Sequence, residues 1–368
     1  MAKRFIYLAV GALALTACTS EDVVEDVTAS RNLIQFENVV NKPSRAADLT
    51  TNNLRQFNVF GFYTMPENAS VANEVFDDVT VTRQDGGNWT YEVDDRYWVK
   101  DAKYYFYAYS CGSVTKLSSE YGKFSMNMAP GLTAADRSLM INDYLCDNTH
   151  QHDLIIASNT GATDTDAFAG ILGKDKANDP VSFQFKHILS KVKARFTSKF
   201  SPEYEVVVKN VSIQNIRNVG TYNSASGWTK VERKAGEQPF VYLLNSGDVN
   251  VNPISFKNEK KADGTQAYGE TQTAYVLPFG YSGNEDDKTF VYINFELDLY
   301  FGADKVLTKV LTGKFNPNWI EGYSYIYNVE VSGSTTGMDV ITFTTAQDAD
   351  GNVVTKWNED ETPKIQID

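Results

Sequence analysis

The feature that most constrains the fold is a run of strict two-residue alternation late in the chain. Apolar side chains occupy every second position from residue 291 to residue 301: Val291, Ile293, Phe295, Leu297, Leu299 and Phe301. Successive side chains of a β-strand point to opposite faces, whereas the side chains of a helix repeat about every 3.6 residues. The run therefore predicts one long strand with a single buried face.

Many other segments read as strands, and several are aromatic. Residues 57–63 and 103–109 are almost continuously apolar, which is typical of strands buried on both faces. Residues 79–82 and 89–93 are joined by Asp85-Gly86-Gly87-Asn88, whose residue types favour a hairpin turn. We expect further strands at residues 34–36, 153–158, 181–185, 189–196, 204–216, 274–277, 306–315 and 323–331. Residues 134–146 are interpreted instead as a short helix.

The spacing of these strands indicates the fold class and the number of domains. Strands at intervals of roughly 10 to 15 residues, with almost no helical periodicity, are typical of β-sandwiches. A chain of 368 residues has room for two ordinary domains, and the polar segment 159–180 reads as their junction. We predict an all-β protein with one β-sandwich at residues 46–170 and a second at residues 171–368.

The first residues predict export. Lys3 and Arg4 precede an apolar stretch shorter than the roughly 20 residues that a membrane-spanning helix needs, so residues 1–17 read as a signal peptide. Leu15-Thr16-Ala17-Cys18 resembles a bacterial lipobox, in which the cysteine is acylated and becomes the new N-terminus; an ordinary signal peptide with an incidental Cys18 is the alternative. A lipid on Cys18 would hold the protein on a membrane. The acidic segment Ser20-Glu21-Asp22 after the cysteine is typical of surface-exposed outer-membrane lipoproteins, so we expect that location.

Composition argues against several classes of function. The net charge is −13, and it becomes −15 when Lys3 and Arg4 leave with the signal peptide, so the chain repels nucleic-acid phosphates. No nucleotide-binding, serine-hydrolase or zinc-protease motif is present, so we expect neither an enzyme nor a cofactor nor a metal. In the exported chain Cys111 and Cys146 either form a disulfide or are buried thiols, and the sequence leaves both open.

The remaining polar patterns favour structural roles over chemistry. His150 and His152 are interpreted as part of a polar loop rather than as metal ligands, and His187 as a core or cross-strand side chain. The acidic residues after position 347 fit a calcium-loop spacing in part, but Val353 stands where that loop needs glycine, which favours a turn. Carboxylate pairs of the kind glycosidases use occur at two strand ends, where turns account for them: Asp77-Asp78 and Asp94-Asp95.

Several segments, taken in order, resemble the fimbrillin family, the type V pilins of certain Gram-negative anaerobes. Residues 183–192 (Phe-Gln-Phe-Lys-His-Ile-Leu-Ser-Lys-Val) are similar to that family's strand motif F-x-H-x-L-S-K-V. The other matching segments are the lipobox, residues 34–36 followed by residues 44–46, residues 104–109, 153–157 and 322–329, and Trp357. The order of these segments along nearly the whole chain carries the likeness.

The resemblance implies two transthyretin-like β-sandwich domains in tandem, in a lipoprotein that is built into a surface pilus for adhesion. A lipoprotein signal peptidase would free Cys18, and an arginine-specific protease would cut between Arg45 and Ala46. Loss of residues 18–45 would remove the strand around Ile34 and Phe36 and open a groove. A strand from another pilus subunit would fill that groove head to tail, as in donor-strand exchange.

The resemblance leaves the details of assembly open. The tail at residues 364–368 (Lys-Ile-Gln-Ile-Asp) alternates as a donor strand would, but it is short and follows Pro363. The chain could therefore be a stalk, anchor, accessory or tip subunit, and its receptor could be a host protein or a glycan.

The alternative is a surface glycan-binding lipoprotein that does not polymerise. Such a protein would present two or three coplanar aromatic side chains on one exposed face as sugar platforms. The candidates are Trp89, Trp98, Trp228, Trp319 and Trp357. A hydrolase that uses one of the acidic residues is a third reading.

Overall fold

The protein is built almost entirely of β-strands. The computed structural model describes residues 33–40, 49, 53–99, 101–112, 116–117, 119–127, 129, 132, 136–148, 151–158, 171–172, 180–232, 241–243, 253–280, 291–315, 317–333, 341–345 and 355–356. Among them the single helical element is the 3-10 turn η1 (Ser119–Tyr121), and none of the described helices could cross a membrane. The all-β sandwich class predicted from the sequence is confirmed.

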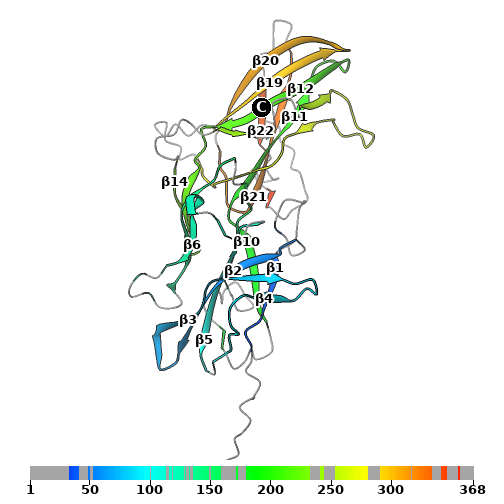
Figure 1. The fold of residues 1–368 in the computed structure, drawn as a ribbon. Coiled ribbons are helices and arrows are strands. Elements are labelled where there is room, and N and C mark those ends of the chain that lie inside the picture. Colours follow the sequence, from blue (N-terminus) through cyan, green and yellow to red (C-terminus); the bar gives the residue numbers. More distant parts are fainter. Residues whose placement is uncertain are drawn as a thin grey trace, which may run out of the picture.

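The N-terminal half forms one eight-stranded sheet, the first sheet. Its strands lie in the order β1 (Phe36–Val40), β10 (Val181–His187), β8 (Ile155–Ser158), β5 (Lys103–Ser110), β2 (Gln56–Met65), β3 (Asn68–Arg83) and β4 (Trp89–Tyr91), with β9 (Ile171–Leu172) beside β5. The turn between β3 and β4 is the one predicted, and Gly87 adopts the positive φ of 85° that this turn requires. Figure 1 shows β1, β2, β4 and β10 together in the lower half of the molecule.

Both faces of the first sheet are buried, as the continuous apolar runs in β2 and β5 predict. On the inner face, Phe57 and Phe106 belong to a cluster that also holds residues of β1 and β10, which we call the inner core. On the outer face, Phe60 and Tyr107 belong to a second, larger cluster that continues into the C-terminal half. The alternation of β2 and β5 therefore serves two cores at once.

A small sheet covers the outer face of the first sheet. It has the order β14 (Gly227–Glu232), β13 (Val219–Asn223), β7 (Leu139–Leu145) and β6 (Lys123–Met126). The ring of Phe124 stacks on that of Tyr109, with centroids 4.0 Å apart. The short helix predicted within residues 134–146 is wrong, because β7 pairs with β6 on one side and β13 on the other. This pairing overrides the weak local preference.

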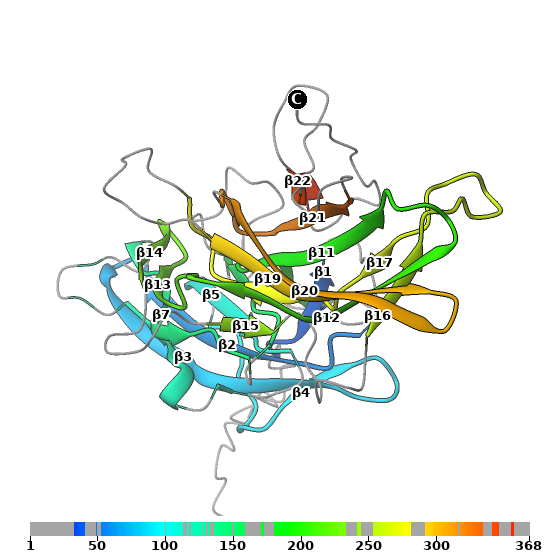
Figure 2. The same cartoon turned by 90° about the horizontal axis from the view of Figure 1, so that it is seen from above.

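The C-terminal half is a sandwich of two sheets. One has the order β17 (Gly269–Glu270), β11 (Ser190–Ser198), β21 (Tyr323–Val331) and β22 (Ile341–Thr345), with β18 (Ala274–Val276) beside β11 and β23 (Thr355–Lys356) beside β21. The other has the order β15 (Val241–Leu243), β12 (Tyr204–Gln214), β19 (Val291–Phe301) and β20 (Asp304–Phe315), with β16 (Ile254–Lys257) beside β12. Phe196 and Phe295 meet between the two sheets with their ring centroids 5.0 Å apart. Figure 2 shows β11 and β19 lying across one another in these layers.

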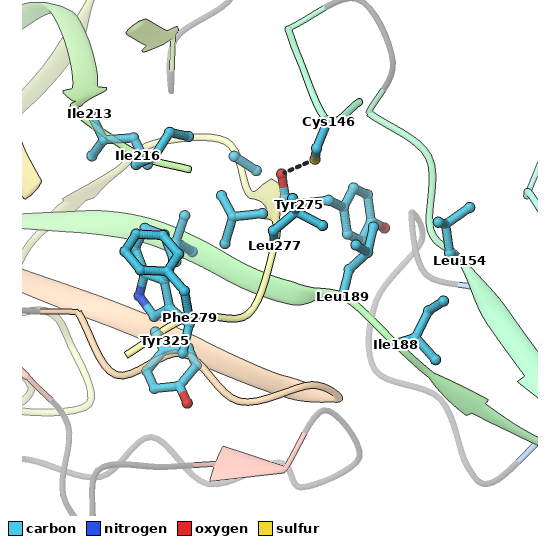
Figure 3. Close-up of a cluster of buried hydrophobic side chains, with 14 of the residues drawn as sticks. Cys146, Leu154, Ile188, Leu189, Ile213, Ile216, Tyr275, Leu277, Phe279 and Tyr325 are labelled. Carbon is cyan, nitrogen blue, oxygen red and sulfur yellow. Dashed lines mark hydrogen bonds between the residues drawn. The ribbon is translucent and has the colours of Figure 1, made fainter. Parts of the chain in front are cut away.

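The two halves share strands and core. Strand β10 follows the expected junction at residues 159–180 yet lies in the first sheet, and β6 and β7 join β13 and β14. The expected division between residues 170 and 171 does not coincide with a division between sheets. Figure 3 shows the shared core, in which Leu154, Ile188 and Leu189 lie near Tyr275 and Leu277.

A buried carboxylate on strand β19 of the C-terminal sandwich accepts hydrogen bonds from three neighbouring side chains. Asp298 on β19 is fully buried and accepts hydrogen bonds from Lys209, Lys305 (2.9 Å) and Thr308 (2.6 Å). Burial alone would raise its pKa, but these donors outweigh burial and lower the pKa from 3.8 to about 2. The carboxylate is therefore more stable in the folded chain than in the unfolded chain.

We expect Asp298→Asn to lower the free energy of unfolding at neutral pH by about 2 kcal/mol, because charged hydrogen bonds are lost. The folded pKa lies below the unfolded value, so the contribution of Asp298 is complete above about pH 4 and disappears as the pH falls through about 2. Denaturant unfolding at pH 7 and at lower pH measures both effects, with exposed Asp304→Asn as the control. An equal loss at every pH would contradict the assignment.

Candidate assembly site around the first strand

Residues 33–40, the first-strand segment, lie between two other parts of the first sheet. On one side β1 pairs in parallel with β10, from Phe36 opposite Val181 to Val40 opposite Phe185, and Val181 N donates to Gln35 O at 2.7 Å. On the other side Leu33 forms an antiparallel bridge with Tyr97, and Ile34 N donates to Arg96 O at 2.8 Å. The segment therefore joins the two ends of the first sheet.

The two residues predicted to fill a groove are both buried in the inner core. Ile34 is 0% exposed and Phe36 is 4% exposed, whereas Gln35 between them is exposed. The Phe36 ring lies 5.3 to 6.2 Å, between centroids, from five other aromatic rings: Phe57, Phe76, Tyr91, Phe106 and Phe183. The Phe36 side chain therefore fills the centre of a cage of five aromatic rings, one from each of the strands β2, β3, β4, β5 and β10.

A buried hydrogen-bonded pair, His187 and Asp153, holds the chain on the other side of the expected cleavage point. His187 Nδ1 on β10 lies 2.9 Å from Asp153 Oδ1, and both side chains are at most 5% exposed. The second carboxylate oxygen of Asp153 accepts a hydrogen bond of 2.8 Å from Leu49 N. Leu49 itself is buried. The backbone just downstream of residues 45 and 46 is therefore fixed to the strand that pairs with β1.

This pair is the feature that sequence reasoning missed. His187 was expected to be a core or cross-strand side chain, and it is buried as expected. Its partner Asp153 begins an apolar segment, and a charged residue leading into a buried strand is the one signal in the sequence that could have been followed.

Three of the expected processing residues lie outside the described part of the chain: Cys18, Arg45 and Ala46. The same holds for His150, Trp357, the calcium-like acidic residues and the tail at residues 364–368. Lipidation and cleavage therefore stay predictions.

The structure holds Cys111 and Cys146 as thiols rather than as a disulfide. Both are buried, and burial raises the pKa of the Cys111 thiol well above its ordinary value. The Cys146 thiol donates to Tyr275 O at 3.3 Å (Figure 3). Of the two alternatives left open by the sequence, the structure has the buried thiols.

The four described tryptophans pack into the protein. Trp319 is 2% exposed and donates its indole N–H to Tyr327. The other three are half-buried, and their rings lie 4.6 to 5.2 Å from those of core aromatic residues: Trp89 on Phe57, Trp98 on Tyr104 and Trp228 on Tyr222. These contacts use the ring surface that a coplanar sugar platform would need to expose.

The acidic pairs do not form a metal site within the described residues. No group of three or more His, Cys, Asp or Glu in that part of the chain could hold a metal ion. Asp78 instead accepts from the Tyr109 hydroxyl at 2.5 Å and pairs with Lys116 at 2.7 Å. It sits at a bulge of β3 opposite β2, with a positive φ of 51°. This carboxylate is a structural group.

The fold and the buried first strand define an all-β protein in which one short edge strand joins the ends of a sheet. A family model described as fimbrillin-like matches residues 44–347, and the chain belongs to this fimbrillin-like family. Membership supports a fimbrial, non-enzymatic protein at the cell surface that assembles with other fimbrial subunits. The family resemblance seen in the sequence is confirmed.

The fold is similar to that of a solved fimbrial protein. A fimbrial protein from Bacteroides vulgatus is 12% identical with a TM-score of 0.56, and the match covers 85% of this chain and 98% of that chain. A protein from Bacteroides ovatus assigned to cell adhesion is 15% identical with a TM-score of 0.45, over 90% of this chain and 100% of that one. No curated protein sequence matches this chain.

Proposed function

We propose that this protein is a structural subunit of a cell-surface fimbria that serves adhesion. It is exported as a lipoprotein through Cys18, trimmed between Arg45 and Ala46, and assembled by donor-strand exchange with other subunits. The observation that carries the proposal is the burial of Ile34 and Phe36 in a slot with backbone hydrogen bonds on both sides. The segment that trimming would remove is therefore part of the core.

The energetic cost of an empty slot supports exchange. Burial of an Ile or a Phe side chain stabilises the fold by roughly 1.5–3 kcal/mol. Loss of Ile34 and Phe36 from the slot therefore costs roughly 3–6 kcal/mol of burial free energy, and it also leaves the edge of β10 unpaired. Another extended peptide with two buried side chains would recover that free energy. A strand taken from the next subunit makes a head-to-tail contact that does not close on itself, which is the geometry of a filament.

The contacts of Leu49 support trimming at the predicted place. A cut between residues 45 and 46 separates the first-strand segment from Leu49, whose backbone N–H is held by Asp153. The upstream piece is then free to leave, while the downstream chain keeps its place.

The tail is the donor candidate within this chain. Ile365-Gln366-Ile367 repeats the apolar-Gln-apolar order of Ile34-Gln35-Phe36. Two buried apolar side chains with an exposed glutamine between them are what the slot accepts. The tail of a neighbouring copy would match this pattern in the direction of β1.

Arg45→Gln is the test of processing. We expect surface preparations of the unchanged chain to contain a form that begins at Ala46 and runs as a heat-resistant ladder on gels, because exchanged strands separate slowly. Arg45→Gln should yield chains that begin at Cys18 and give no ladder, whereas Arg55→Gln, at an arginine that the structure shows to be exposed, should change nothing. N-terminal sequencing checks this prediction, and only acylated full-length monomer in the unchanged protein would contradict it.

A further inference from the structure

The two ends of the first sheet meet along a seam that is only partly closed. A cavity of about 680 Å³ lies there, with Phe36 on one wall and Trp89 and Tyr91 on the other. The closure consists of the Leu33–Tyr97 bridge and the bond from Ile34 to Arg96, whereas β1 pairs with β10 along its whole length. The seam is thus the weaker of the two sides that hold the first-strand segment.

Both walls of the seam present backbone hydrogen-bonding groups. Gln84 N donates to Asn88 O at 2.8 Å, so the backbone groups of Asn88 point toward β3. Backbone groups alternate in direction along a strand, so the N–H and C=O groups of Trp89 and Tyr91 point away from β3. On the other wall, Gln35 O faces β10 while Ile34 N faces Arg96, so the backbone of Phe36 points into the seam as well. Among the described strands, β4 ends the order of the first sheet.

The charged residues along the seam follow a fixed order. Leu33 lies opposite Tyr97, and Phe36 lies against Tyr91. The first-strand segment therefore runs antiparallel to residues 91–97, and its later residues lie opposite earlier residues of the other wall. Asp95 therefore lines the cavity near the start of the segment. Arg83, the register partner of Trp89, lines it further along.

We infer that the seam between β1 and β4 is a docking site for an extended peptide, the C-terminal tail of a second copy of this chain, which binds there before the first strand leaves. The inference rests on the proposed exchange and adds its order of events. The tail Lys-Ile-Gln-Ile-Asp, laid in the direction of β1, places Lys364 beside Asp95 and Asp368 beside Arg83. Phe36 and Tyr91 lie too close together for a strand between them, so the backbone of the tail would bond to the open edge of β4 beyond this contact.

A disulfide staple separates docking from exchange. Leu33 and Tyr97 form a non-hydrogen-bonded antiparallel pair, a geometry whose Cα separation suits a disulfide. The full chain carrying Leu33→Cys and Tyr97→Cys is oxidised, cut at Arg45, and mixed with a labelled synthetic peptide of residues 355–368, with or without a reductant. Oxidised protein should show rapid, reversible binding whose observed rate rises linearly with peptide concentration. Reduced protein should show the same phase followed by slow, tight capture with release of the strand.

The outcomes distinguish the inference from the function it rests on. If oxidised protein binds no peptide while reduced protein captures it, at a rate independent of peptide concentration, the first strand leaves before docking and the inference is overturned while exchange stands. If neither form binds, the tail is not the donor and the inference falls with that part of the proposal, whereas the Ala46 terminus and the ladder test assembly separately.

Charge reversal places the docking step at the seam. Asp95→Lys should slow the rapid phase about threefold and leave the final captured complex unchanged, because a charge at the rim of a site acts mainly on association. Asp94→Lys makes the same change at an exposed neighbour that does not line the cavity, and it should leave the rate unaltered. Equal slowing by both variants would place docking elsewhere.

Discussion

Phe36→Ala should lower the free energy of unfolding of the uncut chain by about 3–5 kcal/mol, the range for removal of a buried phenylalanine. Five aromatic rings surround this side chain, and they come from strands of one hydrogen-bonded sheet, so the cage cannot close without breaking pairs. Denaturant unfolding of the intact protein measures the loss. The matched control is Gln35→Ala, at the exposed neighbour, which we expect to stay within about 0.5 kcal/mol of the unchanged protein.

The same substitution should act on release of the strand. After cleavage at Arg45 the first-strand segment is held by non-covalent contacts alone. A loss of about 3 kcal/mol in those contacts corresponds to roughly a hundredfold weaker retention. Mass spectrometry of the cut protein after gel filtration should therefore find the fragment retained in the unchanged protein and lost from Phe36→Ala. A fragment retained equally in both would show that the slot does not depend on this ring.

The strands themselves could be predicted because their patterns are local. The alternation from Val291 to Phe301 and the two-faced apolar run within β2 depend only on residues adjacent in the chain. The burial of Ile34 and Phe36 follows from the same kind of pattern. What surrounds these two residues does not, because β10 and residues 96–97 reach the segment from distant parts of the chain.

The pairings could not be predicted for the same physical reason. The local sequence of β7 favours a helix, and its pairing with β6 and β13 makes it a strand. The expected junction at residues 159–180 follows a change in composition, whereas the parallel pairing of β10 with β1 joins residues that lie 145 positions apart, as Phe36 and Val181 do. Composition marks loops, and sheet order is set by long-range contacts.

Asp153→Ala should lower the free energy of unfolding by about 3 kcal/mol, because it removes the buried carboxylate that both Leu49 N and His187 Nδ1 contact. Leu49 N and His187 Nδ1 both lose their contact with the carboxylate, in a region where side chains are at most 5% exposed. The loss should also appear locally, as faster amide hydrogen exchange at Leu49 than in the unchanged protein. The hydrogen bonds of Asp153 to Leu49 and His187 do not involve the five rings around Phe36, so the Phe36 cage serves as an internal reference.

Asp153→Asn is the matched control that separates hydrogen bonding from charge. Its amide oxygen can accept from Leu49 N–H while its amide nitrogen donates to His187 Nδ1, so we expect a loss of about 1 kcal/mol or less. After cleavage, Asp153→Asn should still give a single N-terminus at Ala46, because Leu49 stays fixed. Asp153→Ala should give several N-termini, because the loosened chain lets the protease reach positions beyond Ala46. Equal behaviour of the two variants would mean that this buried pair does not hold the new end of the chain, and trimming would then need another stop.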